Sequence, residues 1–300
     1  MRKLLKKELF QSQFEDLGYI IIDLNNPNII DLIDKEYHQL NPDDNFNPND
    51  GRYHCTFIDT NIQYKKKAFE LFKNHITPII KEHLIDYDLL AGNFYVKPKN
   101  ACEFEVHQNW SVVDETKHTT VTIWIPMQDT NEFNGTLEVI PGSHKISKNI
   151  TCLHEPYFFD KFETELKRKY FQTINLKKGQ AIIFDDKLVH YSKTNQSSKS
   201  RRALQLIAVP KEAELLIHFI DKDDSNYYNI FETNSEFYLQ HNISHFMDGK
   251  PPLKHVGRVP NKNVLYTEEE FVEALKRGNK FRKDLYSKDS IKTTDLTFME

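Results

Sequence analysis

The sequence contains few cysteines, no long apolar run and no block of charge of one sign. Cys55, Cys102 and Cys152 are widely separated and odd in number, which favours reduced thiols in a cytoplasmic protein over a disulfide framework. The longest apolar runs, at residues 19–24 and 122–127, are far shorter than the roughly 20 residues that span a bilayer. We therefore predict no transmembrane helix and no membrane partner.

Charge is balanced along the chain. The 40 basic and 44 acidic residues give a net charge of −4 and a pI near 6.4, and no basic block suggests a nucleic-acid-binding surface. We therefore expect no nucleic-acid partner. The first residues are basic, but Glu8 comes before any apolar region develops, so we expect no secretory signal.

The first part of the chain has the apolar spacing of helices. This spacing predicts a helix that ends at Gly18, a second that begins after Asn28, and a third from Lys65 to Leu84 with a kink at Pro78. Only the apolar run at 19–24 predicts a strand in this part of the chain. Helices therefore precede the region where the period changes.

Residues 40–60, between the second and third helices, are rich in Asn, Asp and Pro and predict a long loop. Loops of this length are usually disordered or functional. We put forward the hypothesis that Arg52, Tyr53 and His54 form a lid over an active site.

The hydrophobic period changes to that of strands after residue 90. About nine short β-rich runs lie between residues 93 and 221, separated by turn signals such as Asn134-Gly135, Pro141-Gly142 and Lys178-Gly179. Regular short strands with such turns indicate a closed or two-sheet β architecture, a jelly roll or cupin-like barrel among them. The longest break, at 144–170, predicts an excursion at one end of the barrel.

We predict a single domain over residues 1–300, mainly β with flanking helices (α+β). Its parts are an N-terminal helical region with the first strand at 1–90, a β core at 91–222 and a C-terminal extension at 223–300. The extension reads as polar coil around its Pro-Pro pair. A helix at 268–277 follows, because Thr267 and Glu270 form a capping-box pattern and Gly278 a stop.

Two histidines far apart in the sequence could meet inside this core. His107 and Asn109 are two positions apart in a predicted strand, so they point the same way, and Glu105 shares that side if the strand is regular. His190 follows a second apolar strand, and Arg201 begins the next one. Two imidazoles and one oxygen leave three open positions on a metal, as in non-haem Fe(II) oxygenases, and an arginine suits the far carboxylate of a 2-oxo acid.

The sequence resembles the phytanoyl-CoA dioxygenase family of Fe(II)/2-oxoglutarate oxygenases. The resemblance is densest in "HQNWSVVDE", "TIWIPMQDTNEFNGTLEVIPGSH" and "GQAIIFDDKLVHYSKTNQSSKSRRA". It implies a double-stranded β-helix fold with Fe(II), 2-oxoglutarate and O2 as cofactor and co-substrates. It also implies hydroxylation of an unactivated carbon in a small molecule of amino-acid, acyl or natural-product type.

The resemblance also assigns residues. It implies that His107 and His190 bind the metal, and that Arg201, about eleven residues after His190, binds 2-oxoglutarate. These three are the expected catalytic residues. Trp124 and Ser192 match positions that help to seat 2-oxoglutarate. Lys97 could pair with a carboxylate of the substrate or co-substrate, and an exposed lysine at a strand end is the alternative.

Asn109 stands where the family pattern has aspartate. An amide oxygen is a neutral and weaker ligand, so the change should reduce affinity for Fe(II). Asn109 could still coordinate through its oxygen, or Glu105 or an anion from solvent could fill the position. Alternatively, the protein has lost turnover and only binds. A neutral residue here is also similar to related halogenases, although asparagine is bulkier than the Ala or Gly found there.

Several neighbouring residues allow two interpretations. Trp110 could line a substrate pocket or belong to the core. Asp114 and Glu115 could serve as backup ligands or be solvated carboxylates after a strand. Arg202 must point away from Arg201 if both lie on one strand, so only one of them reaches the co-substrate.

Overall fold

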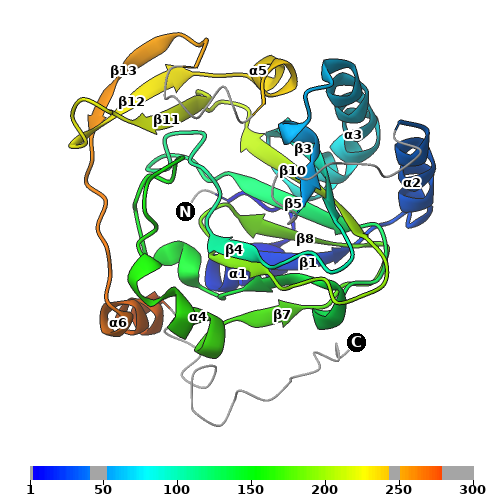
Figure 1. The fold of residues 1–300 in the computed structure, drawn as a ribbon, viewed down its shortest axis with the longest axis horizontal. Helices are drawn as coiled ribbons and strands as arrows, with labels where there is room; N and C mark the ends of the chain where they lie inside the picture. Colours follow the sequence, from blue (N-terminus) through cyan, green and yellow to red (C-terminus); the bar gives the residue numbers. More distant parts are fainter. Residues whose placement is uncertain (1–2, 41–52, 243–250, 279–300) are drawn as a thin grey trace.

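Two antiparallel sheets form the centre of the molecule. A computed structural model describes residues 3–40, 53–242 and 251–278. The larger sheet has six strands in the order β1-β8-β5-β10-β3-β2, and the smaller has four in the order β4-β9-β6-β7 (Figure 1). The large sheet consists of β1 (Tyr19–Asp23), β2 (His54–Cys55), β3 (Tyr87–Lys97), β5 (Val121–Pro126), β8 (Gln180–Asp185) and β10 (Arg201–Pro210). The small sheet consists of β4 (Phe104–His107), β6 (Leu137–Val139), β7 (Gln172–Ile174) and β9 (His190–Ser192). This arrangement confirms the predicted jelly-roll core.

Alternation along β10 shows how the large sheet divides the interior. Leu204 and Leu206 pack into an apolar cluster with residues of the helices on one face of the sheet. Ala203 packs into a second cluster with strands of the small sheet, and Arg201 has the same parity. The space between the two sheets therefore receives the side chains that the sequence marked as functional.

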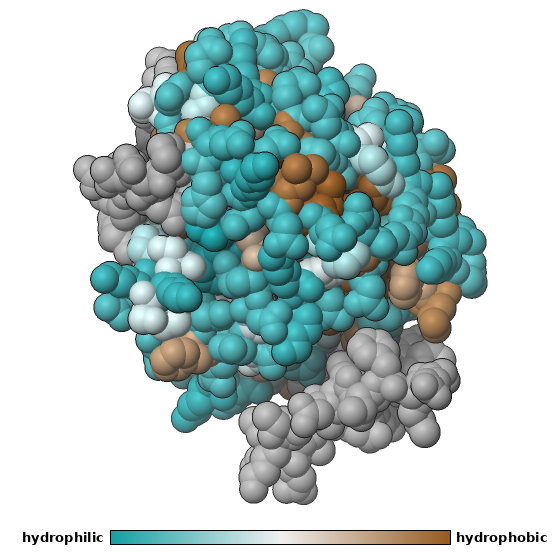
Figure 2. Space-filling model, turned by 90° about the vertical axis from the view of Figure 1, so that its right-hand side faces the viewer, coloured by the Kyte–Doolittle hydropathy of each residue, from teal (hydrophilic) through white to brown (hydrophobic). Residues whose placement is uncertain are grey.

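Helices cover the outer face of the large sheet. They are α1 (Glu8–Leu17), α2 (Asn28–Leu40) and α3 (Ile62–His83) (Figure 1). Gly18 ends α1 with φ 82°, a left-handed conformation that glycine adopts without strain, and its N–H donates to the Phe14 carbonyl at 2.8 Å. Pro78 lies inside α3, which continues to His83. The outward face of this side is largely hydrophilic, with limited apolar patches (Figure 2).

The C-terminal extension has no regular structure at Pro251 and Pro252, as predicted, but it contains two strands that the sequence analysis did not predict. It adds β12 (Tyr227–Glu232) and β13 (His255–Pro260) to β11 (Leu216–Ile220) in a third, three-stranded sheet. The "YYNIF" run explains the difference, because these residues have high β propensity and Tyr228 is fully buried although the surrounding sequence is polar. A short helix, α5 (Ser235–Gln240), follows β12.

The last described helix, α6 (Glu268–Gly278), agrees with its sequence signals. The Thr267 N–H donates to Glu270 Oε2 at 2.8 Å, and the Glu270 N–H donates to Thr267 Oγ1 at 3.2 Å, which completes the capping box. Phe271 packs with Phe158 and Phe162 of the segment around α4 (Glu163–Lys169), at the end of the core where the excursion was expected. None of the helices in the described ranges combines the length and apolar character that a membrane crossing would need.

Candidate active site

His107 and His190 lie directly opposite each other on the neighbouring strands β4 and β9. Their ring centroids are 4.1 Å apart. The Nδ1 atom of His107 is 2.9 Å from the Glu105 carbonyl oxygen, and that of His190 is 2.8 Å from the Leu188 carbonyl oxygen. A carbonyl oxygen only accepts hydrogen bonds, so both Nδ1 atoms donate and each Nε2 keeps a lone pair for a cation.

Both imidazoles are held in the neutral form. Burial lowers the pKa of His107 to about 4, although the bond to the Glu105 carbonyl opposes the shift. Burial lowers the pKa of His190 well below its ordinary value, and His107 adds to this effect. Neutral imidazole is the form that binds metals, so the pair is ready to act as ligands near neutral pH.

Asn109 lies just beyond the end of β4 and still lines the same cavity as His107. Its Nδ2 donates to Thr122 Oγ1 and to Asp186 Oδ1, both at 2.8 Å. Its Oδ1 has no hydrogen-bond partner among the residues that the structure describes. The expectation that these two residues share a side is therefore met, although Asn109 is not part of the strand.

Glu105 does not lie on the side of β4 that a regular strand would give it, next to His107 and Asn109. The pairing of β4 with β9 shifts register between Phe104 and His107, and Glu105 is exposed. Glu105 lines a larger neighbouring cavity but not the small cavity between the sheets. The structure therefore does not favour Glu105 as a substitute for a ligand at position 109.

A small cavity of about 70 Å³ lies between the two sheets beside the histidine pair. All seven residues predicted for the site line this cavity: Lys97, His107, Asn109, Trp124, His190, Ser192 and Arg201. The rest of the wall consists of Tyr53, Tyr95, Phe104, Leu137, Phe184, Tyr191 and Gln205. The seven predicted residues alone come from five strands and from the loop after β4, and they meet at one place. A single small ligand could contact the histidines and Arg201 together.

Arg201 lines this cavity, and only part of its guanidinium is hydrogen-bonded to the described residues. It is 4% exposed, and its guanidinium lies 5.4 Å from the centre of the Trp124 ring. Nη2 donates to the Gly135 carbonyl at 3.1 Å, whereas Nε and Nη1 are buried and have no hydrogen-bond partner in the part of the chain that the structure describes. Buried unpaired guanidinium donors are costly, so this group suits a carboxylate ligand.

Arg202 points the other way, as alternation requires. It forms an ion pair with Asp34 at 3.0 Å on the helix-covered side of the large sheet. Its guanidinium also lies 5.5 Å from the centre of the Tyr37 ring. Of these two neighbouring arginines, only Arg201 lines the cavity.

Lys97 is deeply buried at 2% exposure, so the alternative of an exposed strand-end lysine is wrong. Its Nζ donates to the Ser192 carbonyl at 3.0 Å, to Ser192 Oγ at 2.9 Å and to the Lys193 carbonyl. Burial and then the nearby charge of Arg201 lower the pKa of Lys97 to about 7. Two basic groups, Lys97 and Arg201, therefore line the same small cavity, where a bound anion would relieve their repulsion.

A larger cavity of about 400 Å³ adjoins the small one, and His107 and Asn109 line both. Trp110 is part of its wall and also packs against an apolar core cluster, so it belongs to the core and to a cavity wall at once. The pair of cavities would place one ligand beside Arg201 and a second on the other side of His107 and Asn109. This is the arrangement that a two-substrate reaction needs.

The proposed lid is only partly supported. Arg52 lies outside the described residues. Tyr53 lines both cavities and stacks on Tyr95 with ring centroids 5.1 Å apart. The lid hypothesis is wrong for His54, because this residue is buried in β2, opposite Val96, with its Nε2 3.2 Å from Asp59 Oδ2.

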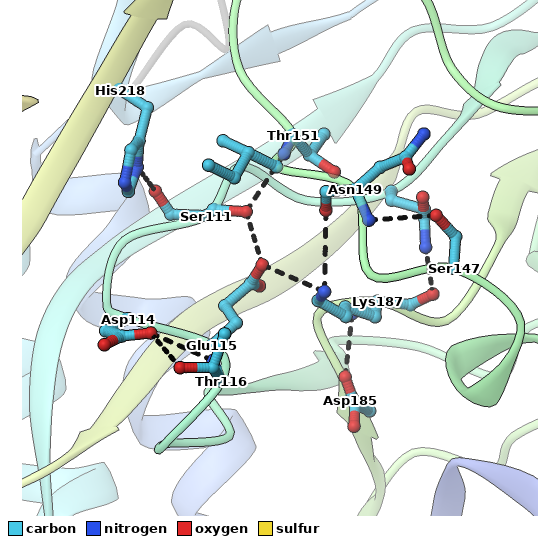
Figure 3. Close-up of polar contacts among 12 residues, drawn as sticks. Ser111, Asp114, Glu115, Thr116, Ser147, Asn149, Thr151, Asp185, Lys187 and His218 are labelled. Atoms are coloured by element: carbon cyan, nitrogen blue, oxygen red, sulfur yellow. Dashed lines mark hydrogen bonds and ion pairs between the residues drawn. The ribbon is translucent and has the colours of Figure 1, made fainter. Parts of the chain in front are cut away.

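A polar network fixes the loop that follows Asn109 (Figure 3). Glu115 accepts a hydrogen bond from Ser111 Oγ at 2.6 Å and forms an ion pair with Lys187 at 3.2 Å. The Thr151 N–H donates to Ser111 Oγ at 3.0 Å, and Gln108 Nε2 donates to the Lys187 carbonyl. The loop after β4 is thereby tied to the turn that leads into His190, so the network helps to hold the two histidine-bearing segments together.

The contacts of Asp114 and Glu115 show what these two carboxylates after β4 do. The solvated interpretation is wrong for Glu115, whose side chain is 10% exposed and pairs with Lys187. Asp114 contacts Thr116 and Lys117 near the surface. Neither carboxylate lines either cavity, so the structure does not support them as backup ligands.

Sequence reasoning missed three residues of the site. Thr122 and Asp186 hold the Asn109 amide, and Gln205 lines both cavities from β10. Gln205 could have been found, because it is a polar residue at the inward parity of Arg201 in an otherwise apolar strand. Asp186 belongs to a conspicuous Asp-Asp pair before His190, but only the fold shows that it meets Asn109.

The donor set is suited to a metal with two nitrogen ligands and one amide oxygen. Within residues 3–40, 53–242 and 251–278, no three His, Cys, Asp or Glu side chains gather as a metal site. That result is expected here, since the third candidate ligand is an amide. Two Nε2 lone pairs beside an amide oxygen that accepts no hydrogen bond from the described residues fit a divalent cation. The two unpartnered donor atoms of the Arg201 guanidinium fit its 2-oxo acid.

Comparisons with solved structures agree with this fold. The epimerase SnoN, solved in complex with Fe3+, alpha ketoglutarate and nogalamycin RO, superposes with a TM-score of 0.55 at 15% sequence identity. The match covers 69% of this chain and 85% of SnoN. At this identity the likeness shows a shared fold.

Sequence comparisons extend the agreement to a family. The chain is 30% identical over 148 residues to the phytanoyl-CoA dioxygenase domain-containing protein 1 homolog of Dictyostelium discoideum, which is 46% of this chain and 49% of that protein. It is 32% identical over 120 residues to a phytanoyl-CoA dioxygenase of Arabidopsis thaliana, which is 39% of this chain and 42% of the relative. The matches thus span half or less of each curated relative. Residues 33–203 match the family described as phytanoyl-CoA dioxygenase (PhyH), so the chain belongs to that family.

Proposed function

We propose that this protein is an Fe(II)- and 2-oxoglutarate-dependent oxygenase that hydroxylates an unactivated carbon of a small molecule. The observation that carries the proposal is the small cavity, where two neutral histidines and a buried guanidinium with two unpartnered donor atoms face one space within the described ranges. Membership of the PhyH family and the likeness to SnoN, which was solved with Fe3+ and alpha ketoglutarate, support it.

His107, His190 and Asn109 would hold the metal through two Nε2 atoms and one Oδ1 atom. Bound iron would supply the activation of dioxygen and the oxidation. The residues of this chain contribute by holding the ligands rigidly, since both Nδ1 atoms and the Asn109 Nδ2 atom are already committed to partners. The buried setting excludes water from the reacting groups.

Arg201 would bind the far carboxylate of 2-oxoglutarate through its unpaired Nε and Nη1 atoms. Lys97 would add positive charge and hold Ser192 in place through two hydrogen bonds. Trp124 forms a flat wall beside the guanidinium and fixes its plane. These contacts would align the 2-oxo acid between Arg201 and the histidine pair.

The second substrate would occupy the larger cavity. Its wall combines apolar side chains such as Leu90 and Ile207 with amide groups of Asn93 and Gln205. Asn93 Nδ2 donates to Gln205 Oε1 at 2.9 Å, so this amide pair is positioned as a unit. We propose a partly apolar small molecule with a polar group that meets this pair.

A binding protein without turnover is the second candidate, because Asn109 replaces the usual carboxylate. The experiment that separates them is anaerobic titration with Mn(II) and 2-oxoglutarate, followed by measurement of succinate in air with Fe(II). We expect both ligands to bind and succinate to form. Binding of both without succinate in a broad panel of small molecules would favour the binding protein, and failure to bind either would exclude both candidates.

A further inference from the structure

The hydrogen-bonding partners of Asn109 leave its amide one acceptable orientation. Thr122 Oγ1 carries one hydrogen, which it donates to Asp186 Oδ1 at 2.6 Å. Oγ1 must therefore accept from position 109, and Asp186 Oδ1 accepts as well. Only the NH2 end of the amide supplies two donors, so Nδ2 points inward and Oδ1 is left for the cavity.

The inward partners lie behind Asn109 rather than beside the ligand space. Asn109 lines both cavities, whereas Thr122 and Asp186 line neither. The backbone adds to the arrangement, because the Asn109 N–H donates to the Asp186 carbonyl at 2.9 Å. Asp186 is 1% exposed and Thr122 is fully buried, so solvent cannot supply alternative partners.

From this geometry we infer that Asp186 and Thr122 are positioning residues that make Asn109 the matched metal ligand of this protein. The inference rests on the proposed function. It departs from the interpretation that Asn109 is a weaker substitute for aspartate. An aspartate at 109 would place a carboxylate oxygen, which can only accept, beside Thr122 Oγ1 and Asp186 Oδ1. These three oxygens would then have a single hydrogen, that of Thr122, between them. Asparagine at 109 and aspartate at 186 therefore belong together as a donor and acceptor pair.

The test is the affinity of the apoprotein for Mn(II), measured without turnover by electron paramagnetic resonance. D186A removes the acceptor, and we expect an affinity loss of about tenfold, in the range seen when an outer partner of a ligand is removed. T122V keeps the shape of Thr122 without its hydroxyl and should lose affinity in the same direction. D185N is the matched control, because Asp185 is a buried carboxylate at the end of β8, next to Asp186, that accepts from the Lys187 N–H and has no hydrogen bond to Asn109 within the described ranges.

Exchange of the pair provides the sharpest comparison. N109D should bind Mn(II) no more tightly than the wild type, despite its new carboxylate. N109D/D186N should bind about tenfold more tightly than N109D, because the amide at 186 again supplies the donor that the inward oxygen of 109 needs. D185N in the N109D background should give no such rescue.

The outcomes separate the two levels of the proposal. A wild-type protein that does not bind Mn(II) would overturn the proposed function together with this inference. A wild-type protein that binds Mn(II), with N109D clearly tighter and D186A and T122V unchanged, would overturn this inference alone. If N109D does not fold, unchanged Mn(II) affinity in both D186A and T122V is sufficient to overturn it.

Discussion

His107 and His190 are register partners on β4 and β9, and their ring centroids are 4.1 Å apart although the residues are far apart in the sequence. Each ring donates its Nδ1 hydrogen to a backbone carbonyl of its own segment. The fold therefore fixes both the position and the tautomer of the pair before any ligand arrives.

Removal of the Arg201 side chain should weaken 2-oxoglutarate binding by about 100-fold, since two hydrogen bonds to a charged group are lost. Calorimetric titration with 2-oxoglutarate in the presence of Mn(II) measures this change for R201A. R202A is the matched control, because Arg202 contacts Asp34 on the other face of the sheet. Equal effects of the two substitutions would contradict the assigned role of Arg201.

Mn(II) binding should resist acid. A proton competes with the metal for Nε2, and burial lowers the pKa of His107 to about 4 from an ordinary value of 6.5. Competition therefore begins only as the pH falls toward 4, and Mn(II) affinity should stay nearly constant down to about pH 5. Electron paramagnetic resonance titrations with Mn(II) at several pH values across this range measure the affinity. A loss of affinity centred near pH 6.5 would mean that the surroundings of the two histidines do not lower their pKa.

Lys97 should make stability depend on pH in the alkaline range. Its pKa is about 7 in the folded protein against an ordinary 10.5, so between these values the unfolded chain binds more protons. The contribution of Lys97 to the free energy of unfolding should therefore rise with pH across this window and be constant below it. Urea denaturation of the wild type and K97M at several pH values measures the difference. Substitution of the exposed Lys99 by Met is the control and should show no such trend.

G135A should lower stability and weaken 2-oxoglutarate binding together. Gly135 has φ 73°, and an added Cβ would lie 2.6 Å from the Lys193 carbonyl oxygen, which cannot move easily because it is backbone. We expect a cost of about 2 kcal/mol in the free energy of unfolding. The Gly135 carbonyl also accepts from Arg201 Nη2, so its displacement should disturb the guanidinium.

The control for G135A lies in the same turn. Phe133 is 58% exposed, so F133A should leave both the urea midpoint and the 2-oxoglutarate affinity near their wild-type values. If G135A matches F133A in both measurements, Gly135 does not support Arg201.

Much of the core could be predicted from sequence because its signals are local. The nine runs between 93 and 221 alternate or are continuously apolar, and each contains a strand of the structure. The parity of Arg201 and Arg202 on β10 is likewise local. The strands β12 and β13 were not predicted from the polar tail because they are short and are paired only through tertiary contacts.

The remainder of the site depends on contacts that no local pattern contains. Asn109 leaves β4 and meets Asp186 through the backbone and the side chain, a pairing across 77 positions of the sequence. Glu105 loses its expected place because of a register shift. The identity of residue 109 could be read from the sequence, but the partners that make an amide suitable there could not.

The most direct measurement is the position of Mn(II) in a crystal grown anaerobically with 2-oxoglutarate. We predict anomalous density bonded to Nε2 of His107, Nε2 of His190 and Oδ1 of Asn109, with the far carboxylate of 2-oxoglutarate on Arg201. Manganese bound away from the histidine pair, or 2-oxoglutarate that does not contact Arg201, would contradict the proposed function.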